Sequence, residues 1–135
     1  MSRNSKGINA ERELIHLFWA HQWAAIRIAG SGANRYPSPD LLVGNSERRM
    51  AIECKTSRSR VKYLPTEDIE QLRTFARTFG AEAWLAIKFM HANWHFLNLE
   101  DLTISGNNFS ISLETAQKKG LLLEELIEKK GIKEN

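Results

Sequence analysis

The feature that most constrains the fold is a hairpin signal in the middle of the chain. Segment 40–43, with its apolar run, and the alternating segment 50–55 both have the composition of β-strands. Between them lie Gly44, Asn45 and Ser46, which are residues that tight turns favour. The two segments are therefore predicted to pair as a β-hairpin, which brings the start of the first strand close to the end of the second.

Three ionisable side chains meet at that end of the predicted hairpin. Asp40 begins the first strand, while Glu53 and Lys55 point to one face of the second strand, opposite to Cys54. Two carboxylates about 4 Å apart repel by roughly 4 kcal/mol at a protein surface, so a proton, the lysine or a cation must hold them together. Carboxylate oxygens suit Mg²⁺, which also accepts a substrate phosphate. Beside such a metal, Lys55 could orient or deprotonate a water, or stabilise a pentavalent phosphate.

The order of these residues resembles a nuclease signature. Pro39-Asp40, twelve intervening residues and Glu53-Cys54-Lys55 are similar to the PD-(D/E)xK pattern, whose families cut nucleic-acid phosphodiesters with a divalent metal. The alternative is a surface hairpin in which Asp40 starts a turn and Glu53 pairs with Lys55.

Size and charge narrow the class of protein. A chain of 135 residues forms one domain with a real core, and 42% apolar and 26% charged residues exclude disordered and fibrous classes. Without a signal run or a long uninterrupted apolar stretch, we expect a soluble cytoplasmic protein with no membrane partner. Residues 1–62 hold 11 of the 19 Lys and Arg residues but 5 of the 16 Asp and Glu residues. The half with the motif therefore suits a polyanion such as nucleic acid, although a solvated surface gives a weaker version of the same skew.

The remaining pattern predicts an α/β fold with a central five-stranded mixed sheet flanked by helices on both faces. The single domain (1–135) would comprise a flexible basic arm (1–7), a core (8–100) and a C-terminal hairpin and helical tail (101–135). Before the hairpin we expect a helix at 8–22, a strand at 23–29 and a loop at 30–39. After it we expect a phosphate-contacting segment at 56–63, a helix at 66–79 capped by Thr66, and strands at 83–89 and 94–97. The tail is expected to form an edge hairpin at 103–112, a short helix capped by Ser112 and ending at Gly120, and a helix at 121–130.

Several polar residues outside the hairpin are candidates for the site. Glu11 lies within the apolar stripe of the first helix, where an unpaired carboxylate is costly to bury, so it needs a partner or a cleft. Arg27 could steady Glu11 or reach a phosphate, and loop 30–39 suits a lid that closes over substrate. Cations suited to phosphates are Arg3, Lys6, Arg27, Arg35, Arg58, Arg60 and Lys62. The spacing of His91 and His95 does not predict a zinc site.

These residues together resemble the archaeal Holliday junction resolvase family over roughly residues 6–100. Glu11 stands in the first helix, Arg27 in the first strand, and Gly30-Ser31-Gly32 precedes the Pro-x-Pro-Asp turn; the opening K-G-I-N-A-E-R-E-L and the segment F-A-R-T-F-G-A-E-A-W-L-A-I-K-F are also similar. The loop before Asp40 is longer than the family pattern.

The resemblance implies a restriction-endonuclease-like fold, a homodimer, and paired symmetric incision of four-way DNA junctions with Mg²⁺ or Mn²⁺ in recombination and repair, at the nucleoid. Carried over by position, it implies that Asp40 and Glu53 are metal ligands supported by Glu11. It also implies that Lys55 is catalytic, and that Ser31 acts near the scissile phosphate, beside Arg27.

Other interpretations stay open. The chain could be a nuclease of the same class acting on ordinary duplex or flap DNA, or a non-catalytic DNA-binding module with structural carboxylates. A two-fold dimer would present two equivalent sites to a junction. The candidates for its apolar patch are Trp84, Phe89, Trp94 and Phe96, although core packing has the first claim on aromatic residues. The incision position and any replication or recombination protein partner are left open.

Overall fold

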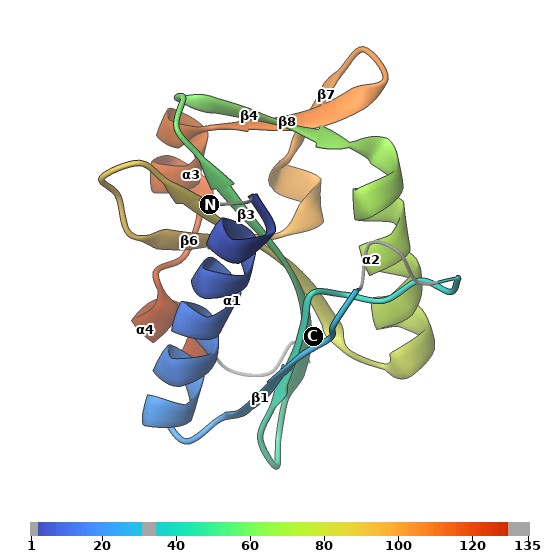
Figure 1. The fold of residues 1–135 in the computed structure, drawn as a ribbon, viewed down its shortest axis with the longest axis vertical. Coiled ribbons are helices and arrows are strands. Elements are labelled where there is room, and N and C mark those ends of the chain that lie inside the picture. The colour runs from blue at the N-terminus through green and yellow to red at the C-terminus, as the bar shows by residue number, and fades with distance from the viewer. Residues whose placement is uncertain (1–2, 31–34, 130–135) are drawn as a thin grey trace.

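The predicted α/β class is confirmed by a computed structural model that describes residues 3–30 and 35–129, with side chains from residue 7 onward (Figure 1). A five-stranded sheet has the order β1-β2-β3-β5-β6. Its strands are β1 (Ala24–Arg27), β2 (Leu41–Gly44), β3 (Arg49–Ser57), β5 (Glu82–Phe89) and β6 (Trp94–Leu97). The β3–β5 pair is parallel and the other pairs are antiparallel, so the sheet is mixed as predicted.

The central hairpin forms as the turn residues predict. β2 and β3 pair in antiparallel register, with Leu41 opposite Ile52. In the turn, the side-chain Oδ1 of Asn45 accepts hydrogen bonds of 2.8 Å from the backbone N–H groups of Glu47 and Arg48. A Cβ at Gly44 would lie 3.1 Å from the carbonyl oxygen of Arg48, so the close approach of the two strands favours glycine here.

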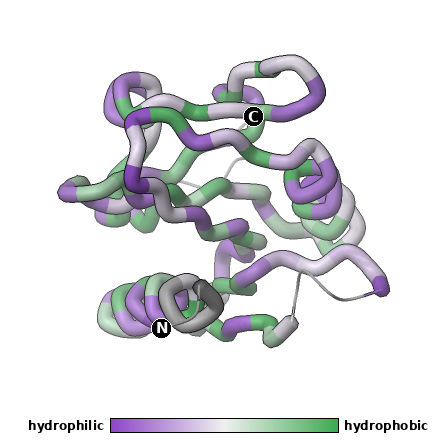
Figure 2. The backbone as a smooth tube through the Cα atoms, turned by 45° about the horizontal axis from the view of Figure 1, so that its top comes forward, coloured by the Kyte–Doolittle hydropathy of each residue, from purple (hydrophilic) through white to green (hydrophobic). Residues whose placement is uncertain are grey.

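Helices cover both faces of this sheet and divide the core in two. Helices α1 (Arg3–Ala20) and α4 (Leu123–Glu128) share a buried cluster with Ile52 on one face. Helices α2 (Thr66–Phe79) and α3 (Leu113–Lys119) share a second cluster with Leu85 on the other. Figure 2 shows hydrophobic residues in the strands between the helices and hydrophilic residues in the peripheral turns. None of the described helices combines the length and apolar content needed to span a bilayer.

The aromatic residues predicted to form a dimer patch lie in these cores instead. Trp84, Phe89, Trp94 and Phe96 are each at most 5% exposed. All four stand on β5 or on the edge strand β6, in a sheet that helices cover on both faces, and burial of such large apolar side chains contributes to stability. The predicted dimer patch is therefore wrong.

A second, three-stranded sheet was not predicted. It has the order β4-β8-β7 and consists of β4 (Val61–Pro65), β7 (Thr103–Ser105) and β8 (Asn108–Ser112), which lie together at the top of Figure 1. The hairpin expected at 103–112 is present, but β8 lies between β7 and β4. Segment 56–63 thus comprises the end of β3, a bend at 58–60 and the start of β4, which gains its hydrogen bonds from a strand far later in the chain.

Several boundaries differ from the predicted ones. Helix α1 begins at Arg3, so residues 3–7 are helical rather than part of an arm; a helix can extend beyond its buried stripe without adding to the apolar pattern. Pro65, not Thr66, is the N-cap of α2, and the Thr66 hydroxyl donates a hydrogen bond to the carbonyl of Asn107. Ser112 caps α3 as predicted. The last helix is shorter than 121–130, because Leu121 forms an antiparallel bridge to Phe96.

A buried arginine ties the C-terminal segment to the start of the sheet. Arg48 is 7% exposed, and its guanidinium donates hydrogen bonds of 2.8 and 2.9 Å to the carboxylate of Glu82. It also donates bonds of 2.8 Å to the carbonyl oxygens of Leu126 and Lys129, and it lies 5.3 Å from the ring centroid of Trp23. Arg48 therefore binds two carbonyl oxygens at the C-terminal end of α4, where a helix has fewer backbone donors than acceptors.

Candidate active site

The hairpin places Asp40 beside the part of β3 that carries Glu53 and Lys55. The carbonyl of Asp40 accepts the backbone N–H of Ile28 at 2.9 Å, and its own N–H donates to Ile52 at 3.1 Å. Its side-chain Oδ2 accepts the backbone N–H of Cys54 at 2.9 Å. Asp40 is therefore fixed between β1 and β3 by backbone bonds and by its carboxylate.

Glu53 and Lys55 share one face of β3, as the alternation predicts. That face turns toward α2, where Lys55 Nζ donates a 2.8 Å hydrogen bond to Asp68 Oδ2. Lys55 Nζ also lies 3.6 Å from Glu53 Oε2. Burial opposes the charged form of Lys55, but the bond to Asp68 and the charge of Glu53 outweigh it, so the pKa of the Lys55 ammonium is raised and the group stays protonated.

Glu11 reaches the same cluster from α1. Its Oε1 lies 3.7 Å from a guanidinium nitrogen of Arg27, which confirms the predicted pairing of these two residues. Helix α1 packs on the face of β3 that carries Ile52 and Cys54, and the charges of Asp40 and Lys55 both act on the pKa of Glu11. Asp40 and Lys55 therefore interact electrostatically with both Glu11 and Glu53.

The carboxyl group of Asp40 therefore interacts with those of Glu11 and Glu53, which come from two other segments of the chain. Burial, followed by the charge of Asp40, raises the pKa of Glu53 to about 8, against the opposing charge of Lys55. The same two causes raise the pKa of Glu11 to about 7, against the charge of Arg27. Burial and these carboxylates also raise the pKa of the Cys54 thiol, which keeps it neutral. The cluster has more negative charge than its cations balance.

This excess of carboxylates bears on metal binding. In the part of the chain that the structure describes, no three His, Cys, Asp or Glu side chains already form a ligand set. The carboxyls of Glu11 and Glu53 instead have raised pKa values beside Asp40, so protons supply the positive charge that the site lacks. Carboxylate oxygens are the ligands that Mg²⁺ prefers. The donor set of Glu11, Asp40 and Glu53 therefore fits a hard divalent cation chemically.

The predicted phosphate-binding residues differ in their surroundings. Arg35 is exposed and stacks over the ring of Tyr36 at 5.8 Å, and Arg58 is exposed as well. Arg60, whose side chain is 70% exposed, pairs with Glu114 of α3. Lys62 is partly buried on β4. Ser31 and the side chains of Arg3 and Lys6 lie outside the described residues, so their roles stay predictions.

Asp68 is the residue of this cluster that sequence reasoning missed. Asp68 lies in the first turn of α2, where an acid is favoured by the helix dipole and needs no other contact to explain it. The signal that could have found it is the direction of Glu53 and Lys55, which point to the face that α2 covers.

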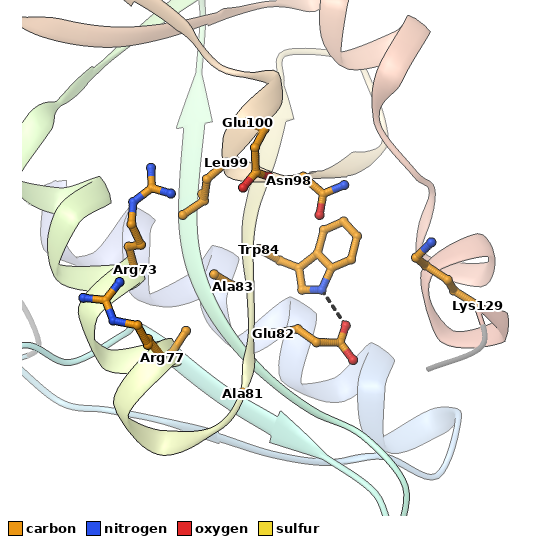
Figure 3. Close-up of a pocket in the computed structure, with 11 residues that line it drawn as sticks. Arg73, Arg77, Ala81, Glu82, Ala83, Trp84, Asn98, Leu99, Glu100 and Lys129 are labelled. Carbon is orange, nitrogen blue, oxygen red and sulfur yellow. Dashed lines mark hydrogen bonds between the residues drawn. The ribbon is translucent and has the colours of Figure 1, made fainter. Parts of the chain in front are cut away.

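A cavity of about 290 Å³ lies away from these residues, between α2 and the start of β5 (Figure 3). None of the predicted catalytic residues lines it. Arg73, Arg77 and Lys129 contribute cations, while Glu82 accepts a 2.9 Å hydrogen bond from Trp84 Nε1, drawn as a dashed line. The carboxylate cluster, not this cavity, is the candidate active site.

Comparison with known proteins adds independent evidence. Residues 2–134 match the family model described as archaeal Holliday junction resolvase (Hjc). The chain is 41% identical over 122 residues to the crossover junction endodeoxyribonuclease Hjc of Archaeoglobus fulgidus, covering 90% of this chain and 89% of that protein. It is 39% identical over 106 residues to the Methanocaldococcus jannaschii protein of the same name, covering 78% and 75%.

A solved structure agrees with the sequence matches. The structure of Archaeoglobus fulgidus Hjc, described as a Holliday junction resolvase from an archaeal hyperthermophile, superposes with a TM-score of 0.83 at 39% identity, covering 89% of this chain and 98% of that one. The five-stranded mixed sheet with helices on both faces accordingly has the restriction-endonuclease-like fold. On its sequence match, its fold and its carboxylate cluster, this chain belongs to the archaeal Holliday junction resolvase (Hjc) family.

Proposed function

We propose that this chain is a structure-selective endodeoxyribonuclease that resolves four-way DNA junctions by paired, symmetric phosphodiester hydrolysis during recombination and repair, with Mg²⁺ as cofactor and Mn²⁺ as an alternative. The observation that carries the proposal is the convergence of Glu11, Asp40 and Glu53 beside the Lys55 ammonium. Membership in a family whose relatives are named crossover junction endodeoxyribonucleases supports the substrate class.

The site residues have separable roles in this proposal. Asp40 and Glu53 would hold the metal, and Glu11 would support them. When bound, a divalent cation lowers the pKa of a coordinated water and polarises the phosphate. Hydrolysis adds a water oxygen to phosphorus and breaks one P–O ester bond. Lys55, kept protonated by Asp68, would donate a hydrogen bond to the phosphate oxygen on which negative charge grows.

The test is a cleavage assay on a synthetic four-way junction with and without Mg²⁺. We expect Asp40→Asn, Glu53→Gln and Lys55→Ala each to lower the cleavage rate at least about 100-fold while metal-free junction affinity stays near that of the parent. Glu67→Gln is the matched control, because Glu67 is exposed in the first turn of α2 and is not among the main groups that act on the pKa of Glu53 or Lys55. Full cleavage by any of the three site variants would refute the assigned chemistry.

The same assay separates the alternative functions. Equal cleavage rates on junctions and linear duplexes would favour a nuclease with another substrate. Absence of cleavage with any divalent metal would favour a non-catalytic DNA-binding module.

Exposed cations are proposed to hold the junction by its phosphates. Arg35 and Arg58 are exposed, and Arg60 extends from the turn before β4. A protein that neutralises phosphates loses affinity linearly in log salt concentration, so Arg58→Ala should reduce the magnitude of that slope by about one. Arg73→Ala, on the far half of α2, is the control. An unchanged slope for Arg58→Ala would remove that residue from the DNA surface.

We further propose that the active form is a homodimer, because a two-fold enzyme matches two symmetric incisions. Its interface needs apolar residues other than the buried aromatics of β5 and β6. Large apolar side chains exposed on the described surface are Trp19, Ile26, Tyr36, Val61, Tyr63, Phe79, Met90, Ile104 and Leu122. Sedimentation at assay concentration should give twice the mass of the chain, and a monomer that makes both incisions would contradict the dimer.

A further inference from the structure

The ammonium of Lys55 lies between two carboxylates on different elements. Its shorter contact, 2.8 Å, is to Asp68 Oδ2 of α2, and its longer contact, 3.6 Å, is to Glu53 Oε2 on its own strand. Asp68 and Glu53 are therefore not equivalent partners: Asp68 makes a charge-assisted hydrogen bond, whereas Glu53 makes a looser ion pair.

Asp68 is held on a rigid part of the fold. It precedes Ile69, which is fully buried, and Leu72 one turn later is 1% exposed, so the first turns of α2 are packed onto the sheet. An acid in the first turn is also favoured by the helix dipole. The carboxylate of Asp68 thus has a fixed position relative to β3, although its side chain is one third exposed.

Asp68 and Glu53 would play different roles toward Lys55 once a metal is bound. A carboxylate oxygen of Glu53 that binds a cation is less available to the ammonium, because both cations compete for the same lone pairs. A lysine side chain has four rotatable bonds and loses much conformational freedom when it is held in one place. The 2.8 Å hydrogen bond to Asp68 would then keep the ammonium at a fixed place.

We propose that Asp68 is a positioning residue that holds Lys55 against the scissile phosphate, an inference that rests on the proposed nuclease function. Asp68 itself touches neither the substrate nor the metal. It accepts one hydrogen bond from the Lys55 ammonium and leaves the remaining N–H groups to face the substrate.

The experiment is single-turnover cleavage of a four-way junction by Asp68→Asn. Removing an outer partner of a catalytic group commonly costs 10- to 100-fold in activity, so we expect the cleavage rate to fall by about that factor. Junction affinity and the Mg²⁺ concentration for half-maximal activity should not change. Asp68→Glu, which keeps the charge, should recover part of the rate, and Glu67→Gln, which loses the same charge in the same helical turn, should cleave at the parental rate.

The outcomes of this experiment distinguish failure of the inference from failure of the proposed function. A rate for Asp68→Asn within about twofold of the parent would overturn the inference, while the proposed function would still stand if Lys55→Ala is inactive. A higher Mg²⁺ requirement would also overturn it, because Asp68 would then act on the metal. Urea unfolding of both Asp68 variants separates loss of fold from loss of positioning; a rate that follows stability rather than the charge at residue 68 would overturn the inference too. Full cleavage by Lys55→Ala would instead refute the proposed function.

Discussion

Replacing Glu53 with glutamine should make the metal-free protein more stable while abolishing its activity. Burial and the charge of Asp40 raise the pKa of Glu53 from an ordinary value of 4.5 to about 8. Below pH 4.5 the carboxyl is protonated in both the folded and unfolded chain, so it makes no difference to stability. Between the two pKa values the unfolded chain releases a proton that the folded chain keeps, and stability falls as pH rises. Above about pH 8 the full cost is present.

The size of this cost follows from the shift. At about 1.4 kcal/mol per pKa unit, a shift from 4.5 to about 8 sets an upper bound of about 5 kcal/mol. Water entry and side-chain movement reduce the penalty of a carboxylate that is 12% exposed, and glutamine loses the 3.6 Å pair with Lys55. We therefore expect Glu53→Gln to raise the free energy of unfolding by about 2 kcal/mol at high pH.

The assay is urea unfolding of Glu53→Gln and the parent in EDTA at about pH 5 and about pH 8.5, at one protein concentration so that association is constant. The stability difference should be large at the higher pH and below about 1 kcal/mol at the lower. Saturating Mg²⁺ at the higher pH should stabilise the parent by about 3 kcal/mol at a hundred times its dissociation constant, and the variant by less. An equal difference at both pH values, or no gain at the higher one, would refute the electrostatic reasoning.

Arg48→Ala should lower the free energy of unfolding by about 3–5 kcal/mol in urea, because it removes the cation that pairs with the partly buried Glu82 carboxylate and the donor to two carbonyl oxygens; a loss below about 1 kcal/mol would show that water replaces the guanidinium. Gly120→Ala should cost about 1–3 kcal/mol, because its Cβ would lie 2.5 Å from the carbonyl oxygen of Ala116. Gly7→Ala, which meets nothing within 4 Å in α1, is the control and should be neutral or stabilising.

Local signals in the sequence predict most of the central sheet. The hairpin between β2 and β3 follows from turn residues that lie next to their strands, and Asn45 makes the hydrogen bonds that such residues favour. The end of α2 at Gly80, where φ is +88°, is likewise a local signal. Strand β4 could not be predicted this way, because it pairs with β8 far along the chain and its alternate side chains face solvent.

The residues of the candidate site also differ in whether a local signal in the sequence predicts them. Glu11, Asp40, Glu53 and Lys55 could be predicted, because a short motif and an acid within an apolar stripe are visible in the sequence. Asp68 could not be found from a local pattern of its own, since its contact with Lys55 depends on how α2 docks on the sheet.

The burial of Arg48 likewise could not be predicted from the sequence around it. A charged residue in a polar turn is normally exposed, and its burial arises only because α4 returns to the start of β3. The pairing of Glu11 with Arg27, in contrast, was one of the two roles expected for Arg27.

The position of Arg48 also explains how the fold tolerates repelling carboxylates. Arg48 immediately precedes β3, and Glu82, its partner, begins the parallel neighbour β5, so a satisfied ion pair stabilises one end of the central strand pair. Glu53 and Lys55 lie further along the same strand, where charges are poorly balanced without a metal. Because β3 is paired on both sides and packed on both faces, the carboxylates cannot move apart without breaking core contacts. Their repulsion is therefore kept within the site, where a divalent cation or a proton can relieve it, and the energetic cost appears as pKa shifts rather than as a distorted strand.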